Sequence, residues 1–105
     1  MAANRMDVLK SMVEQNPRDS FARYGLAMEY AKQADWAEAI AQYRILLEHN
    51  PDYAAAYYHG GQACEKLGRV EEARAMYERG IEVTSRTGDQ HTRSELEAAL
   101  EMLPI

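Results

Sequence analysis

Residues 16–51 read NPRDSFARYGLAMEYAKQADWAEAIAQYRILLEHNP, and the organisation of the whole chain follows from this stretch. Moved along by 34 positions, it overlies residues 50–85 with 10 identities in 36 positions. The identities include the pairs Asn16-Pro17 and Asn50-Pro51, which open and close the stretch. A fixed period of this size is typical of proteins built from stacked helical units.

Each copy of the repeat has the pattern of two helices. In the first copy, Asp19 or Ser20 can cap a helix that runs to about residue 33. Asp35 can cap a second helix by accepting hydrogen bonds from its free N–H groups. Pro51 ends that helix, because the residue before a proline is pushed out of the α region. The apolar positions of the second helix repeat at helical spacing: Trp36, Ala39, Ile40, Tyr43, Leu46 and Leu47.

The second copy follows the same plan, with helices expected over about residues 53–67 and 70–84. Gly68 is a favourable residue for ending the first of these helices. A loop is expected over residues 85–88. Gly60 and Gly80 lie inside the expected helices, where glycine costs about 1 kcal/mol relative to alanine, so we expect this copy to be the softer one.

Two further helices flank the copies. Residues 5–15 carry a helical apolar face at Met6, Leu9, Met12 and Val13. Moved along by 34 positions, they overlie the second helix of the first copy. The chain therefore opens with half a unit. After the loop, Asp89 can cap a last helix, which Pro104 ends. Its apolar edge faces the stack and its acidic residues are expected to face away, as at a solenoid end: Leu96, Ala99, Leu100 and Leu103, against Glu95, Glu97 and Glu101.

Composition narrows the class of function. The chain has 105 residues, the size of one domain, and 12 Lys and Arg against 17 Asp and Glu give a net charge of -5. This balance argues against nucleic acid as a partner. We expect no membrane span, because the apolar runs are short, and no internal disulfide, because Cys64 is the single cysteine. Residues 1–10 lack the apolar core of a secretion signal, so we expect a cytoplasmic protein.

The repeated positions resemble the tetratricopeptide repeat, a recurring pattern of two helices with the same period. The first unit departs from the tetratricopeptide pattern at Arg23. It matches the pattern at Leu26, Ala27, Tyr30, Ala39, Tyr43 and Pro51. The second unit carries Tyr57, Gly61, Ala73 and Tyr77, and departs from it at Gly60, Cys64 and Ser85.

The resemblance implies an all-α fold, a right-handed α-α superhelix of about six antiparallel helices. We expect one domain over residues 1–105, with a half-repeat helix at 5–17, repeats at 18–51 and 52–85, and a capping helix at 89–103. The small residues Ala27, Gly61, Ala39 and Ala73 would allow close approach of paired helices.

The resemblance also implies a function, the binding of a peptide or a partner's helix. In this family the first helix of each unit lines a concave groove. Tyr24 and Tyr58 would form a ladder along it, a residue type favoured at binding hot spots. The alternative for these side chains is packing against the flanking helices. The implied groove residues are Phe21, Tyr24, Met28 and Ala31 in the first unit, and Ala55, Tyr58, His59, Gln62 and Glu65 in the second.

The family's clamp for a C-terminal carboxylate uses Lys and Asn at groove positions. Here Tyr24 and Met28 stand in the first unit, and His59 takes the Asn position in the second. We therefore expect an apolar or amphipathic segment as the ligand. Lys32 and Lys66, which occupy matching positions of the two units, lie at the rim or simply in solvent.

Catalysis has little support. His49, His59 and His91 have no metal-ligand spacing, and Cys64 stands at a core position, where a buried small apolar side chain is expected. We expect no catalytic residue, metal or cofactor, and a non-enzymatic protein-interaction module. Two alternatives remain open: a self-assembling, homodimeric helical-repeat protein, and a small enzyme.

Overall fold

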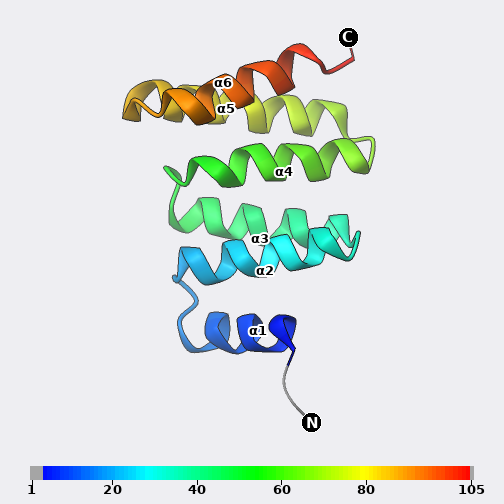
Figure 1. Cartoon of the computed structure of the whole chain (residues 1–105), viewed down its shortest axis with the longest axis vertical. Helices are drawn as coiled ribbons and strands as arrows, with labels where there is room; N and C mark the ends of the chain where they lie inside the picture. The colour runs from blue at the N-terminus through cyan, green and yellow to red at the C-terminus, as the bar shows by residue number, and fades with distance from the viewer. Residues whose placement is uncertain (1–3, 105) are drawn as a thin grey trace.

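The structure is a computed structural model, and it describes residues 4–104. Residues 1–10 are expected not to be a secretion signal, and the first three of them lie outside the described residues. The described part contains six α-helices and no strand, which confirms the all-α prediction. Successive helices run antiparallel and stack along the longest axis of a body of 47 × 29 × 20 Å (Figure 1). The helices are α1 Arg5–Gln15, α2 Ser20–Lys32, α3 Trp36–His49, α4 Ala54–Lys66, α5 Val70–Thr87 and α6 Gln90–Glu101.

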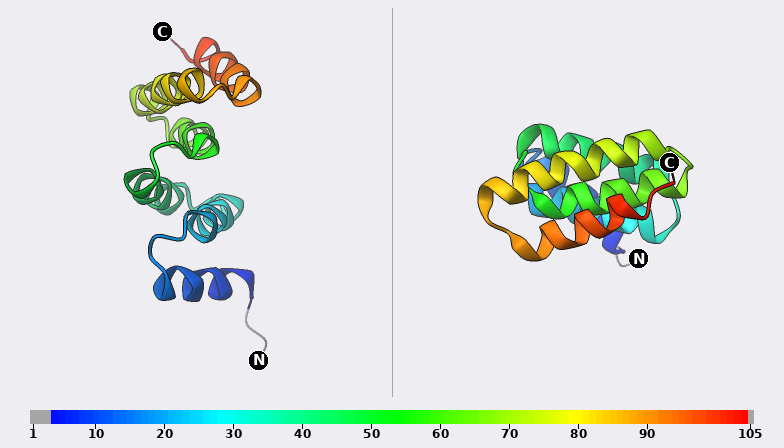
Figure 2. Two further views of the ribbon diagram at one scale, coloured as in Figure 1. Left: turned by 90° about the vertical axis from the view of Figure 1, so that its left-hand side faces the viewer. Right: turned by 90° about the horizontal axis from the view of Figure 1, so that it is seen from above.

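The helices form two layers. Seen from the side, α2, α4 and α6 lie in one layer, and α3 and α5 lie in the other (Figure 2). We call the surface of the first layer, formed by α2, α4 and α6, the inner face. Each helix packs mainly on its neighbours in sequence, and α4 also contacts α6 directly. The inner face is therefore built from alternate helices that the chain visits one unit at a time.

The helix boundaries follow the repeat period closely. Both ends of α4 lie one full period after the corresponding ends of α2, and the starts of α3 and α5, at Trp36 and Val70, are separated by the same period. Asp19 caps α2 as predicted, because its side chain accepts a hydrogen bond from the Ala22 N–H at 3.0 Å. Asp35 is the N-cap residue of α3 as predicted, but the expected side-chain bond is not made: the exposed carboxylate accepts from no N–H of the helix start, and the backbone carbonyl of Asp35 accepts from Ala39.

Helix α5 is longer than predicted. We expected it to end near Thr84, yet it continues to Thr87 through most of the expected loop. Ser85 stands where the preceding units have Pro17 and Pro51, so its backbone N–H is available and the helix is not stopped. Gly88 ends it in the left-handed conformation, at φ 81°. The next helix then begins after Asp89, whose side chain accepts from the N–H of Thr92 as predicted.

The positions predicted for close helix approach lie in the core. Ala27, Ala39 and Ala73 are fully buried, and Gly61 is buried directly beneath the ring of Tyr77. The ring of Tyr43 is likewise fully buried, at the matching position one unit earlier. In α1, Met6 and Leu9 are buried, but Met12 was wrongly predicted to pack inside and is 39% exposed, because α1 packs mainly on α2 and lies at the end of the stack.

Gly80 is required by packing. A Cβ atom at this position would lie 2.8 Å from both Leu96 Cδ1 and Tyr57 Cβ, closer than side chains tolerate. At Gly60 the nearest atom would be Met76 Cε, the flexible tip of a side chain, at 3.1 Å. The helix-propensity cost of Gly80 is thus offset by the tight contact of α5 with α4 and α6.

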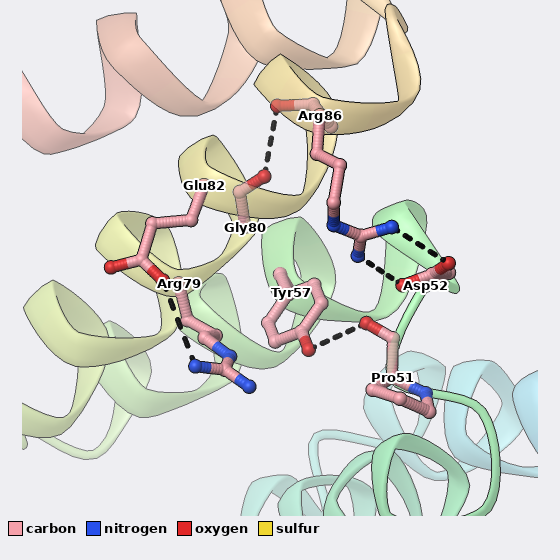
Figure 3. A network of polar contacts seen from close by, with 8 residues as sticks. Pro51, Asp52, Tyr57, Arg79, Gly80, Glu82 and Arg86 are labelled. Carbon is pink, nitrogen blue, oxygen red and sulfur yellow. Dashed lines mark hydrogen bonds and ion pairs between the residues drawn. The ribbon is translucent and has the colours of Figure 1, made fainter.

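Arg23, the departure from the family pattern, makes the contact that an aromatic residue makes in the next unit. Its guanidinium donates to the carbonyl of Pro17 at 3.1 Å and to Gln42 at 2.7 Å. One unit later, the Tyr57 hydroxyl donates to the carbonyl of Pro51 at 2.7 Å (Figure 3). Both side chains tie a first helix to the proline turn that precedes it, so the two units share this bond despite different residues.

Candidate partner-binding face

The predicted groove residues lie along one stripe of each helix on the inner face. In α2 the stripe runs through Phe21, Tyr24 and Met28, at helical spacings of three and then four, which places them on one side of a helix. The same stripe in α4 lies one repeat period later and holds Ala55, Tyr58 and Gln62. The periodic sequence therefore places equivalent side chains side by side on adjacent inner helices.

An aromatic row joins the two stripes. Tyr24 and Tyr58 both contact His59, with ring centroids 5.9 Å and 5.2 Å from the imidazole. Tyr24 also lies 5.2 Å from the ring of Tyr53 and 6.3 Å from that of Tyr43. The predicted tyrosine ladder thus has a histidine as its middle member, and its contacts hold the tyrosine rings in place before any ligand binds.

Burial sets the protonation of this row. Burial lowers the pKa of His59, which the nearby Glu95 carboxylate only partly opposes. Burial also raises the pKa of the Tyr24 hydroxyl, with smaller contributions from Tyr53 and Glu95. The imidazole and the phenol are therefore both neutral near pH 7, which leaves an uncharged, largely apolar strip in the middle of the inner face.

The larger hollow of the inner face, of about 640 Å³, lies between α4 and α6. On the α4 side it is lined by the predicted Tyr58, Gln62 and Glu65, together with Lys66. Burial and a hydrogen bond to Glu65 raise the pKa of the Tyr77 hydroxyl, so it stays protonated and donates to the Glu65 carboxylate. Gln62 Nε2 in turn donates to the Tyr77 hydroxyl at 3.3 Å.

The opposite wall of this hollow comes from α6 and was not predicted. It consists of Glu95, Ala98, Ala99 and Met102, of which Met102 is 85% exposed. The prediction that Glu95 faces away from the stack is wrong, since its side chain borders the hollow.

A signal for this wall was present in the sequence. The spacing of Glu95, Ala99 and Met102 repeats the spacing of Tyr58, Gln62 and Glu65, but with an offset slightly longer than one repeat period. The excess over the period accompanies the extra turn of α5. A search at the exact period therefore does not align the two walls.

A smaller hollow of about 280 Å³ lies between α1 and α2. It is lined by the predicted Phe21, Tyr24 and Met28, with Gly25 between them and Arg5 and Leu9 across from them. Phe21 is 75% exposed, and the sulfur of Met28 accepts a hydrogen bond from the Tyr43 hydroxyl at 2.9 Å. The predicted residues therefore border two hollows, with His59 between them; Ala31 and Ala55 are half-buried and line neither.

The structure also places the metal-ligating and thiol side chains of the described chain. Within residues 4–104, no three His, Cys, Asp or Glu side chains are grouped so as to hold a metal ion. Burial raises the pKa of the Cys64 thiol, which is inaccessible in the core. None of the helices in the described part of the chain is both long and apolar enough to cross a membrane. What the inner face offers is aromatic surface, methionine and a few polar groups.

The family model described as "Tetratricopeptide repeat" matches residues 24–87, more than half of the chain. The TPR repeat-containing protein PA0015 of Pseudomonas aeruginosa is 25% identical over 95 residues, which is 90% of each chain. A tetratricopeptide repeat domain protein of Salinibacter ruber, solved in solution, is 41% identical and superposes with a TM-score of 0.75, covering 81% of this chain and 86% of that one. Protein BPP2914 of Bordetella parapertussis is 27% identical with a TM-score of 0.80, covering 96% of this chain and 87% of that one.

Proposed function

Because the chain belongs to the tetratricopeptide repeat family, we propose that its inner face binds a segment of a protein partner. Domains of this family are generally protein-interaction modules and are typically non-enzymatic. The observation that supports the site is the pair of hollows on the inner face, whose linings include the exposed side chains of Phe21 and Met102. The residues that we assign to contact with the partner are those of the α6 wall together with Phe21, Tyr24, Met28, Ala55, Tyr58, His59, Gln62 and Glu65.

The exposure of large apolar side chains supports a ligand at this face. Phe21 and Met102 are 75% and 85% exposed, whereas phenylalanine and methionine side chains are most often buried in folded proteins. Covering them on binding would contribute about 25 cal/mol for each Å² of apolar surface removed from water. The aromatic row around His59 is already ordered by its internal contacts, so little side-chain entropy is lost when a segment packs on it.

A site-specific crosslinking experiment tests this proposal. The photoreactive residue p-benzoylphenylalanine would be placed at Met102, at Phe21 or, as a control, at Glu78, an exposed residue of α5 in the other layer. All three positions are at the surface, so the fold is retained. After irradiation in a lysate of the source organism, we expect the same protein to be crosslinked from the inner-face positions and not from Glu78. Equal crosslinking from all three positions would refute the inner face as the binding site.

Self-association is the second candidate, supported by the α1 end of the stack. Val8 and Met12 are 47% and 39% exposed there, and their spacing of four residues places them on one side of α1 as an apolar strip. Two copies could bury this surface against each other, as open solenoid ends do. Light scattering over a hundredfold range of concentration distinguishes the candidates. A mass that doubles in the wild type and stays monomeric in Val8→Ser/Met12→Ser supports self-association, whereas a monomer throughout excludes it.

A further inference from the structure

We propose that the segment bound between α4 and α6 is cationic and amphipathic, with a Lys or Arg side chain next to apolar residues. This inference rests on the proposed function, since it specifies the ligand of the same face. It comes from the charges at the larger hollow, where one carboxylate stands on each wall: Glu65 on α4 and Glu95 on α6.

Neither carboxylate is neutralised by an arginine or lysine of the described chain. Glu65 accepts a hydrogen bond from the neutral Tyr77 hydroxyl and takes part in no ion pair among the described residues. Glu95 Oε1 lies 3.5 Å from Nε2 of His91, whose side chain is 87% exposed. The one lysine at this hollow, Lys66, has its ammonium 5.8 Å from the ring centroid of Trp36, which stabilises it at the rim.

Some carboxylates elsewhere in the described chain are paired with its own arginines. Arg44 bonds Glu72 at 2.6 Å between helices, and Arg86 of α5 bonds Asp52 at 2.5 Å (Figure 3). The remaining arginine–carboxylate contacts are Arg5–Glu29, Arg69–Glu72, Arg74–Glu71, Arg79–Glu82 and Arg93–Glu97. Within residues 4–104, Glu65 and Glu95 have no arginine partner, which is also true of exposed carboxylates such as Glu48 and Glu78. These two, however, line the same hollow from opposite walls, so a ligand bound there can supply the complementary positive charge.

The arrangement around these carboxylates specifies the rest of the ligand. Tyr58, Ala99 and the exposed Met102 form the apolar part of the lining, so a cationic head beside an apolar side chain satisfies both. The Tyr77 hydroxyl holds the Glu65 carboxylate in one orientation, which reduces the entropy lost on pairing. The net charge of -5 favours the approach of a positive segment and disfavours an acidic one.

A phage-displayed library of random dodecapeptides, panned on the complete chain, provides the test. Panning would be repeated on the isosteric variant Glu65→Gln/Glu95→Gln and on a matched control, Glu97→Gln/Glu101→Gln, which removes the same charge from exposed positions outside the hollow. We expect the wild type and the control to select peptides with Lys or Arg beside apolar residues. The hollow variant should still select the apolar residues and lose the cationic preference.

One selected peptide would then be titrated by fluorescence anisotropy. We expect the hollow variant to bind it roughly three- to tenfold more weakly and the control less than twofold more weakly, with affinity falling as NaCl is raised. Selection of neutral or acidic apolar peptides, or equal affinity for the hollow variant, would overturn the cationic ligand and leave the proposed function intact. A library that yields no selected peptide at all would overturn both.

Discussion

Ala34 and Gly68 occupy equivalent turns, between the two helices of each unit, and both have a left-handed backbone. Their φ angles are 60° and 72°, and the two positions are separated by one repeat period. Glycine adopts this conformation freely, whereas the Cβ of alanine contacts the following carbonyl oxygen at a cost of about 1–2 kcal/mol. The first unit therefore carries local strain that the second unit avoids, although only the second was predicted to be soft.

The variant Ala34→Gly should be more stable than the wild type. Relief of the left-handed strain outweighs the greater flexibility of glycine in the unfolded chain, so we expect the free energy of unfolding to rise by about 0.5–1 kcal/mol. Urea denaturation followed by circular dichroism measures this change. The reciprocal variant Gly68→Ala serves as the control and should lose about 1 kcal/mol. An unchanged or lower stability of Ala34→Gly would show that the turn is not strained.

At the scale of the helix, α5 shows how one residue changes an element. With serine at position 85, α5 continues for one further turn, which carries Arg86 to Asp52 and moves the start of α6. The hydrogen bond of the Asp52 side chain with Arg86 lowers the pKa of that carboxyl group. Just before this turn, Val83 and Thr84 lie in the core.

Restoring the family's proline with Ser85→Pro should therefore damage this protein. Proline inside a helix removes a backbone hydrogen bond and clashes with the preceding turn, at a cost of about 3 kcal/mol. We expect a clearly lower melting temperature, measured by circular dichroism. Ser85→Ala, which keeps the N–H, should melt within a few degrees of the wild type. A proline variant as stable as the alanine variant would mean that the last turn of α5 contributes little to the fold.

At the scale of the whole molecule, Tyr43 and Tyr77 couple stability to alkaline pH. Both rings are fully buried, and burial is the largest cause that raises the pKa of each hydroxyl above the usual value near 10. The folded chain thus keeps protons that the unfolded chain releases above pH 10. The stability contributed by these neutral hydroxyls is complete below that pH and is lost as pH rises through the folded pKa.

We therefore expect the free energy of unfolding to fall above pH 10, by up to about 1.4 kcal/mol per pH unit for each buried tyrosine. Urea unfolding at pH 8, 10 and 11 gives the slope. In Tyr43→Phe/Tyr77→Phe the rings remain and the slope should be shallower, with Tyr24 and Tyr53 accounting for part of what is left, because burial raises the pKa of both. Identical slopes in the two proteins would exclude these hydroxyls as the cause.

The sequence by itself determined the helices and their order. Asn16-Pro17, Asn50-Pro51, Asp19 and Gly68 act on the backbone within one turn, so their effects could be predicted without knowing the fold. The repeat period likewise predicted that Tyr24 and Tyr58 lie on equivalent stripes of adjacent helices, as the structure shows. Both kinds of signal are local or periodic, and neither depends on a contact between distant residues.

Only the tertiary structure decided which side chains share a site. The extra turn of α5 shifts Glu95, Ala99 and Met102 beyond the repeat period, so the period alone does not align them with α4. The contact of Gly80 with Tyr57 and Leu96 depends in the same way on how three helices meet. Such contacts form between residues far apart in sequence, so their physical reason is packing geometry, which no local pattern encodes.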